Sequence, residues 1–204
     1  MRRVALTGGI ATGKSYCLGR FADFGAATID ADALARQAVA PGTTGFRAVV
    51  ARFGAAIVLP DGSLDRAALG RLVFADPNAR RALEAIVHPA VYGAITRWFE
   101  TTARTGRATA AIADIPLLFE TGRDREFDDV IVTACPPAMQ LARLMARDGL
   151  PEDEARRRLE SQWPIDEKRA RANYVIDTSG SFSETDEQVR AVWAKITAGA
   201  SGRR

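Results

Sequence analysis

The stretch Gly8-Gly-Ile-Ala-Thr-Gly-Lys-Ser15 decides the fold of this chain, because it has the form GxxxxGK[ST] of a phosphate-binding loop. It directly follows an apolar run, Arg3–Leu6, that predicts a buried strand, and a helical pattern begins at Lys14. In such a loop the glycines let successive backbone N–H groups turn toward a phosphate, and the helix N-terminus adds its dipole. We expect Lys14 to reach the β- and γ-phosphates of a nucleotide and the Ser15 hydroxyl to bind Mg²⁺.

The alternative to a phosphate loop is an ordinary glycine-rich turn. It is disfavoured because Lys14, one of only three lysines in the chain, stands at the required position. A phosphate loop alone does not separate kinases from GTPases, ATPases or nucleotide-binding regulators. The sequence shows no NKxD-type guanine signature and no threonine-containing switch segment before the third strand candidate. The remaining motifs must therefore indicate the function.

Length and composition exclude several classes of protein. The 204 residues are 47% hydrophobic and 26% charged, which predicts one globular domain, or one domain with small insertions, and excludes disordered, collagenous and coiled-coil chains. Cys17 and Cys135 lie far apart and His88 is the single histidine, so neither a disulfide framework nor a zinc site is indicated. We expect both cysteines to be buried as small apolar residues.

Charge and hydropathy give expectations about partners. The formal net charge of +3 could suggest nucleic acid, but the basic residues are dispersed among acids, and an anionic small molecule fits equally well. The weakly polar stretch Ala108–Pro116 is far shorter than the roughly 18 apolar residues of a bilayer span. The apolar run that ends at Leu6 is too short for a signal peptide core. We expect a cytoplasmic protein that binds neither nucleic acid nor membrane and has no obligate protein partner.

Short apolar segments alternate with helical patterns, which predicts a parallel sheet covered by helices. Asp76 is expected to cap a helix that begins at Pro77, and His88-Pro89 to break that helix. A last helix, Glu184 to about Ile196, precedes a polar tail, Ser201–Arg204, which we expect to be disordered. The five strand candidates are Arg3–Leu6, Ala27–Ile29, Ala108–Ala113, Val130–Ala134 and Tyr174–Ile176.

The third strand candidate runs directly into Asp114. At the carboxyl edge of a parallel sheet this carboxylate would face the Mg²⁺ site, as a ligand or as the holder of a metal-bound water. The alternative is a loop residue that caps the next segment.

Two aspartates, Asp30 and Asp32, follow the second strand candidate. If the chain stays extended there, both side chains leave it on the same side. A carboxylate at this edge can accept the proton of an attacking hydroxyl during transfer of a γ-phosphoryl group. The alternative for one of them is to cap the helix that begins near Ala33. Asp32 is the better candidate base because it lies further beyond the strand.

Arg143 and Arg147 lie four residues apart and share a helix face. Arginines that face a transferring phosphoryl group would stabilise its spread negative charge, and their segment could close as a lid. The alternative is a solvated face paired with Asp148 and nearby glutamates. Arg156–Arg158 are expected at the surface. His88 marks a helix junction in one interpretation and contacts an anionic acceptor in the other.

Seven segments of the chain resemble the dephospho-coenzyme A kinase family. They occur in that family's order and span nearly the whole chain, from Val4 to about Gly180. The phosphate loop is generic, whereas the DADxxAR-like, HP and DIPLLFE segments are much more specific. The segments are Leu6–Ser15, Ile29–Arg36, Phe53-Gly54, Asp61–Arg66, Val87–Pro89, Asp114–Glu120 and Tyr174–Asp177.

The resemblance implies an α/β fold, a phosphate-loop NTPase-like three-layer sandwich with a five-stranded parallel sheet. The core would comprise residues 1–32, 107–136 and 172–200, with a helical insertion for the CoA portion at 33–106 and a lid at 137–171. The implied reaction is transfer of the γ-phosphate of ATP to the ribose 3′-hydroxyl of dephospho-CoA, the last step of CoA synthesis. ATP is thus the expected co-substrate and Mg²⁺ the expected cofactor.

The resemblance also assigns residue roles. Asp32 matches the aspartate assigned as base, and Arg143 and Arg147 fall in the lid-helix region that contacts phosphates. The residues expected to be catalytic are Asp32, Lys14, Arg143 and Arg147; those expected to bind the acceptor are Asp32 and His88; those expected to bind Mg²⁺ are Ser15 and Asp114. The residues expected to bind ATP are Gly8, Gly9, Ala11, Thr12, Gly13, Lys14, Ser15 and Tyr16.

Two positions depart from the family pattern. Where the family usually reads GSGKST, this chain has Ala11-Thr-Gly-Lys-Ser-Tyr16. Tyr16 cannot supply the usual small hydroxyl, so only its backbone N–H is expected to serve. Thr178 stands where asparagine is common, which removes the expectation of a side-chain contact to adenine there.

Two other functions fit parts of the pattern. One is a different small-molecule or nucleotide kinase on the same fold, which the ligand of the insertion would distinguish. The other is a non-catalytic phosphate-loop module that binds nucleotide to regulate a partner. Asp32 and an arginine lid favour an enzyme, because a binding module needs no base.

Overall fold

The computed structural model describes residues 1–201. The chain divides into two compact units, of which the first contains Met1–Ile29 and the chain from Phe99 onward, and the second contains Asp30–Trp98. The second unit thus differs in its bounds from the insertion expected at residues 33–106. The predicted limits of insertion and lid remain predictions.

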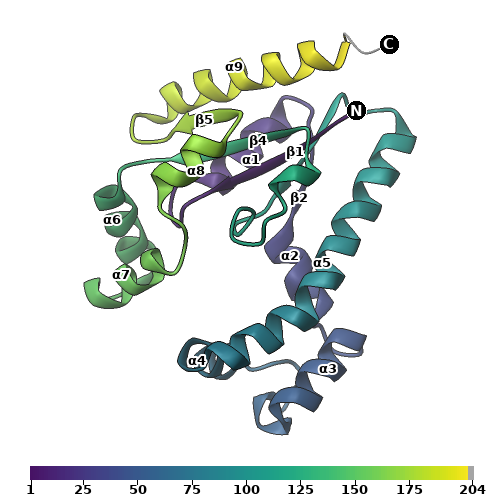
Figure 1. Ribbon diagram of the computed structural model, residues 1–204, viewed down its shortest axis with the longest axis vertical. Coiled ribbons are helices and arrows are strands. Elements are labelled where there is room, and N and C mark those ends of the chain that lie inside the picture. Colours follow the sequence, from purple (N-terminus) through teal and green to yellow (C-terminus); the bar gives the residue numbers. More distant parts are fainter. Residues whose placement is uncertain (202–204) are drawn as a thin grey trace. The chain divides into compact units, whose positions relative to one another are not determined.

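A five-stranded parallel sheet forms the centre of the first unit (Figure 1). The order of the strands is β2-β3-β1-β4-β5, and β1 pairs in parallel with both β3 and β4. Leu6 lies opposite Asp114 on one side of β1, and Gly8 lies opposite Thr133 on the other. The strands are β1 (Arg2–Gly8), β2 (Ala27–Asp30), β3 (Ala110–Asp114), β4 (Asp129–Ala134) and β5 (Tyr174–Asp177). All five strand candidates are confirmed, with ends that differ by one or two residues.

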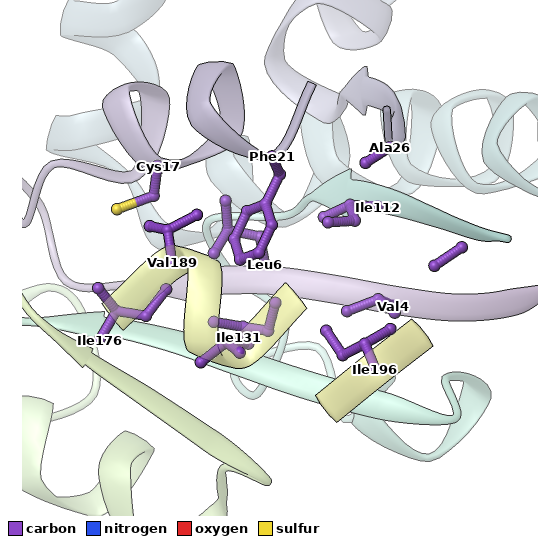
Figure 2. Close-up of a cluster of buried hydrophobic side chains, with 12 residues drawn as sticks. Val4, Leu6, Cys17, Phe21, Ala26, Ile112, Ile131, Ile176, Val189 and Ile196 are labelled. Atoms are coloured by element: carbon purple, nitrogen blue, oxygen red, sulfur yellow. The ribbon is translucent and has the colours of Figure 1, made fainter. Parts of the chain in front are cut away.

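Helices α1 (Lys14–Asp23) and α9 (Phe182–Ser201) pack against the same face of this sheet (Figure 2). Val4 and Leu6 are two residues apart in β1 and therefore share a face, where they join Phe21 of α1 and Ile196 of α9. Each large apolar side chain that is fully buried there stabilises the fold by about 1.5–3 kcal/mol. This core holds the start of α1, and with it the phosphate loop, against the sheet.

Three further helices follow β4 in the first unit: α6 (Pro137–Asp148), α7 (Glu152–Glu160) and α8 (Ile165–Arg171). The unit also contains the short 3₁₀ helix η2 (Asp124–Glu126).

The predicted last helix is longer than expected at both ends, because its apolar spacing identifies the buried middle but not the ends. Ser201, expected in a tail, is the final residue of α9. The rest of that predicted tail, residues 202–204, lies outside the described residues.

The second unit is helical. Its buried centre consists of Val49, Ile57, Leu64 and Leu69. The helices are α2 (Ala31–Ala38), α3 (Thr44–Phe53), η1 (Ala55–Ile57), α4 (Arg66–Ala75) and the first part of α5 (Pro77–Thr105). Thr43 caps α3 and Asp65 caps α4, each by accepting a backbone N–H. Asp76 accepts the N–H of Asn78 at 2.8 Å, which confirms the predicted start of α5.

The predicted break at His88-Pro89 is wrong, because α5 continues through Pro89. Proline removes one hydrogen bond of the helix, and its ring crowds the carbonyl four residues earlier, but a helix can continue past this defect where packing holds both flanking turns. Val91 and Ile95 follow at helical spacing and are both buried. Their burial stabilises the helix beyond the proline.

Both cysteines are buried and free, as expected, and burial raises the pKa of Cys17 to about 12. Within residues 1–201 no helix has the length and apolar character needed to cross a membrane.

Candidate functional site

The phosphate loop joins β1 to α1, and two of its glycines are required by geometry. A Cβ atom on Gly8 would overlap the hydroxyl and the carbonyl of Thr133. Gly13 precedes α1 with a φ of +78°, in the left-handed region that glycine adopts without strain. The N-terminus of α1 therefore opens directly onto the loop, where its free N–H groups favour an anion.

Ala11 occupies the left-handed region as well, with a φ of +60°. For a residue with a Cβ this conformation costs about 1–2 kcal/mol. The surrounding contacts of the loop must therefore hold Ala11 in place.

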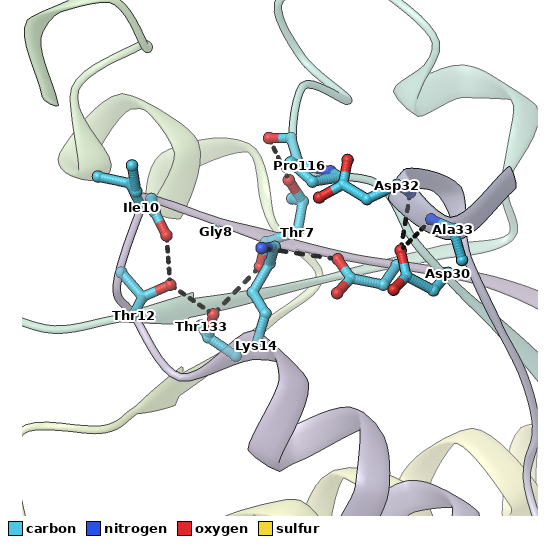
Figure 3. A network of polar contacts seen from close by, with 12 residues as sticks. Thr7, Gly8, Ile10, Thr12, Lys14, Asp30, Asp32, Ala33, Pro116 and Thr133 are labelled. Carbon is cyan, nitrogen blue, oxygen red and sulfur yellow. Dashed lines mark hydrogen bonds and ion pairs between the residues drawn. The ribbon is translucent and has the colours of Figure 1, made fainter. Parts of the chain in front are cut away.

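Three threonine side chains tie the loop to the sheet. The Thr12 hydroxyl donates to the Gly9 carbonyl at 2.7 Å and lies 2.8 Å from the Thr133 hydroxyl of β4 (Figure 3). The Thr178 hydroxyl, just after β5, lies 3.0 Å from the Thr12 carbonyl oxygen and donates to it. Thr178 thus contacts the loop directly and also lines the pocket beside it. The sequence did not predict these roles; the one signal was Thr133, a polar residue at the end of an apolar strand.

Lys14 and Asp114 form the charged centre of the loop. The Lys14 Nζ lies 3.8 Å from Asp114 Oδ1, and both side chains are largely buried. Their nearness follows from the register, because β3 ends at Asp114 beside the strand from which the loop begins. Ser15, the next residue, is exposed in the first turn of α1. The structure thus brings a cation, a carboxylate and a hydroxyl to one edge of the sheet.

A pocket of about 400 Å³ lies between the loop and the start of α9. Arg143 of α6 lines it and donates to the Thr178 carbonyl at 2.8 Å. The exposed ring of Phe182 lies 4.7 Å, between ring centres, from the ring of Tyr16. The Tyr16 hydroxyl donates to Asp186 at 2.8 Å, and this bond lowers the pKa of Asp186. An aromatic ring, an arginine and a small-residue wall are suited to a planar, anionic ligand.

Arg147 has other partners than Arg143, although the two share a helix. Its guanidinium is half-exposed and pairs with the neighbouring carboxylate of Asp148 at 2.7 Å, which lowers the pKa of Asp148. In this structure the surface alternative describes Arg147, and its contact with a phosphate remains a prediction. Arg156 and Arg157 lie exposed on α7, as expected, and Arg158 is partly buried.

The other predicted site residues belong to the second unit. Asp30 caps α2 by accepting the N–H groups of Asp32 at 2.7 Å and Ala33 at 3.2 Å (Figure 3). This confirms that one of the two aspartates is a helix cap. The side chain of Asp32 is exposed in the first turn of α2. His88 is half-buried, with its ring edge toward Tyr92.

The family model of dephospho-CoA kinase matches residues 2–184, a range that includes the loop, Asp32, Asp114 and Arg143. The chain belongs to the dephospho-CoA kinase family. The predicted resemblance is thereby confirmed over nearly the whole chain, and so is the α/β phosphate-loop fold.

Individual proteins and solved structures are similar to this chain along nearly its whole length. A dephospho-CoA kinase of Symbiobacterium thermophilum is 50% identical over 202 residues, which cover 99% of this chain and 84% of that protein. The crystal structure of TT1252 from Thermus thermophilus has a TM-score of 0.79 and 35% identity, and the match covers 95% of this chain and 97% of that one. The dephospho-CoA kinase of Campylobacter jejuni has a TM-score of 0.72 and 28% identity, over 97% and 98% of the two chains.

Proposed function

We propose that this chain transfers the γ-phosphoryl group of ATP to the ribose 3′-hydroxyl of dephospho-CoA, which yields CoA and ADP. Membership of the dephospho-CoA kinase family supports this reaction. The observation that carries it is the phosphate loop itself, in which Lys14 and the N-terminus of α1 meet Asp114 at one edge of the sheet. These groups supply positive charge and N–H donors where the triphosphate would lie.

In the proposed reaction the 3′-oxygen of the acceptor attacks the γ-phosphorus. The new oxygen–phosphorus bond forms as the bond to the ADP oxygen breaks, and the hydroxyl proton passes to the Asp32 carboxylate. Asp32 suits this role because the capping of α2 occupies Asp30 and leaves the Asp32 side chain exposed. Lys14 and Arg143 would offset the negative charge on the transferring group. Arg147 and His88 are proposed as further contacts, to phosphate and acceptor respectively.

Ser15 and Asp114 fit Mg²⁺, because a hydroxyl and a carboxylate are the hard oxygen ligands that this ion prefers. Among residues 1–201 no three His, Cys, Asp or Glu side chains cluster as a metal site, which suits an ion that takes its other ligands from water and phosphate. Bound Mg²⁺ would neutralise charge on the β- and γ-phosphates. We expect excess EDTA to stop ADP formation and added Mg²⁺ to restore it, measured by coupled ADP release. Full activity in EDTA would exclude the metal.

Residues 137–171 are proposed to form a lid. The phosphate groups of bound substrates would give Arg143 and Arg147 stronger partners than their present protein contacts, so the segment Gln140–Trp163 should be more protected in the complex. Hydrogen exchange with and without ATP and dephospho-CoA measures this. Equal protection in both states would make Arg143 and Arg147 ordinary surface residues. Dephospho-CoA alone should protect amides of residues 33–106 if the acceptor binds there.

The acceptor that the chain phosphorylates fastest distinguishes the candidate functions. ADP release should be fast with dephospho-CoA and slow with adenosine or nucleoside monophosphates, at equal concentrations. A nucleoside monophosphate that turns over faster would indicate the rival kinase, and ATP binding without any acceptor would indicate the regulatory module. We also propose a cytoplasmic location, because the reaction consumes ATP.

A further inference from the structure

Lys168 of α8 is a buried cation outside the sequence motifs. Its side chain is fully buried, and its Nζ lies 2.7 Å from Glu120 Oε1, 3.4 Å from the Pro116 carbonyl oxygen and 3.5 Å from the Gly8 carbonyl oxygen. These three acceptors match the three N–H donors of an ammonium group. Burial lowers the pKa of Lys168. The hydrogen bond and charge of Glu120 act to raise this pKa, and the charge of Lys14 acts to lower it further. Because desolvation of a buried charge is costly, the presence of a lysine at this buried position needs a physical reason.

The carbonyls that contact Lys168 belong to the edge of the sheet that bears the site. Gly8 is the last residue of β1 and the first of the phosphate loop. The Pro116 carbonyl, just beyond β3, also accepts from the Thr7 hydroxyl at 3.3 Å. Lys168 therefore joins the chain that enters the loop to the segment that follows Asp114.

A second contact reaches the loop from the same segment. Gln162, six residues before Lys168, accepts the N–H of Ile10 at 2.9 Å. The neighbouring Trp163 donates its N–H to Glu120 at 3.1 Å, and its ring stacks on Phe119 with an interplanar angle of 12°. Residues 162–168 thus hold the loop at two points, the Gly8 carbonyl and the Ile10 N–H.

We propose that Lys168 is a positioning residue that holds the phosphate loop in the shape that binds ATP. The loop contains Ala11 in a strained conformation, so it needs such external support. Glu120 keeps the ammonium aimed at the two carbonyls, and Gln162 fixes the next turn of the loop. Lys168 acts through the loop backbone and contacts no substrate. The proposal deepens the proposed kinase function and rests on it.

The test separates support of the loop from neutralisation of Glu120. Lys168→Met removes the charge at similar volume and leaves the largely buried Glu120 carboxylate without its cation. The double variant Lys168→Met with Glu120→Gln contains neither charge and is expected to fold. Lys195→Met, at an exposed lysine of α9, is the matched control. The measurements are the melting temperature, the Kd of a fluorescent ATP analogue, and KM for each substrate.

We expect the double variant to recover most of the melting temperature lost in Lys168→Met. Its Kd and KM for ATP should stay raised by about tenfold or more, as for the loss of a hydrogen bond to a charged group, while KM for dephospho-CoA changes little. Wild-type ATP affinity in the double variant would overturn the proposal, and so would equal losses for both substrates. The Kd needs no acceptor, so a wild-type chain that binds ATP but leaves dephospho-CoA unchanged would refute the proposed function alone.

Discussion

Lys14→Ala is expected to abolish ATP-dependent turnover, the largest effect that any single substitution should have on this chain. The Lys14 ammonium is the charge that the loop directs to the β- and γ-phosphates, and the loop N–H groups cannot replace it. Because Asp114 would lose its cation, we also expect a stability loss of about 1–3 kcal/mol, with the fold retained. Steady-state ADP release and thermal unfolding measure the two effects.

Lys195→Ala is the control for this substitution, since Lys195 is exposed and far along α9. It should match the wild type in both measurements. If Lys14→Ala retains more than about a tenth of the wild-type kcat, a loss of only about 1.4 kcal/mol, the assignment of the phosphate loop is wrong.

Asp32→Asn is expected to lower kcat by about a hundredfold or more with little change in ATP affinity, because general-base catalysis typically contributes that much. Asparagine is nearly isosteric but cannot take the hydroxyl proton. Rapid-mix measurement of the chemical step, with the Kd for ATP beside it, distinguishes the two effects.

Asp30→Asn is the matched control, because asparagine caps a helix as well as aspartate does. It should leave α2 intact and kcat near the wild-type value. If Asp32→Asn weakens binding of Mg²⁺ and ATP but spares the chemistry at saturation, Asp32 belongs to the metal site. A large loss in Asp30→Asn alone would make Asp30 the base.

The sequence predicts those parts of the fold that depend on local pattern. Strand, loop and helix follow one another within Arg2–Asp23. The loop motif therefore predicts a strand before it and a helix after it, and the apolar patterns on both sides support the motif. Asp76 is predicted correctly because an aspartate before a proline is a local signal. The continuation of α5 through Pro89 is not predicted, because the burial of Val91 and Ile95 depends on packing that no local pattern shows.

The candidate site likewise contains residues that the sequence predicts and residues that it does not. Lys14 and Asp114 are predicted because each stands at a strand end that topology brings together. Lys168 follows its partner Gly8 by 160 residues, and no spacing rule links them. The only feature of the sequence that drew attention to Lys168 was that the chain has just three lysines. The sequence offered pairing with Asp148 as one of two alternatives for Arg147, and the rotamer of the side chain decides between them.

The most direct test of the central claim is to incubate the purified chain with ATP, Mg²⁺ and dephospho-CoA and to identify the products. We predict equal amounts of ADP and CoA, with the new phosphate on the ribose 3′-oxygen, as located by phosphorus NMR and mass spectrometry. ADP without a phosphorylated acceptor, or a phosphate on any other oxygen, would contradict the proposed function.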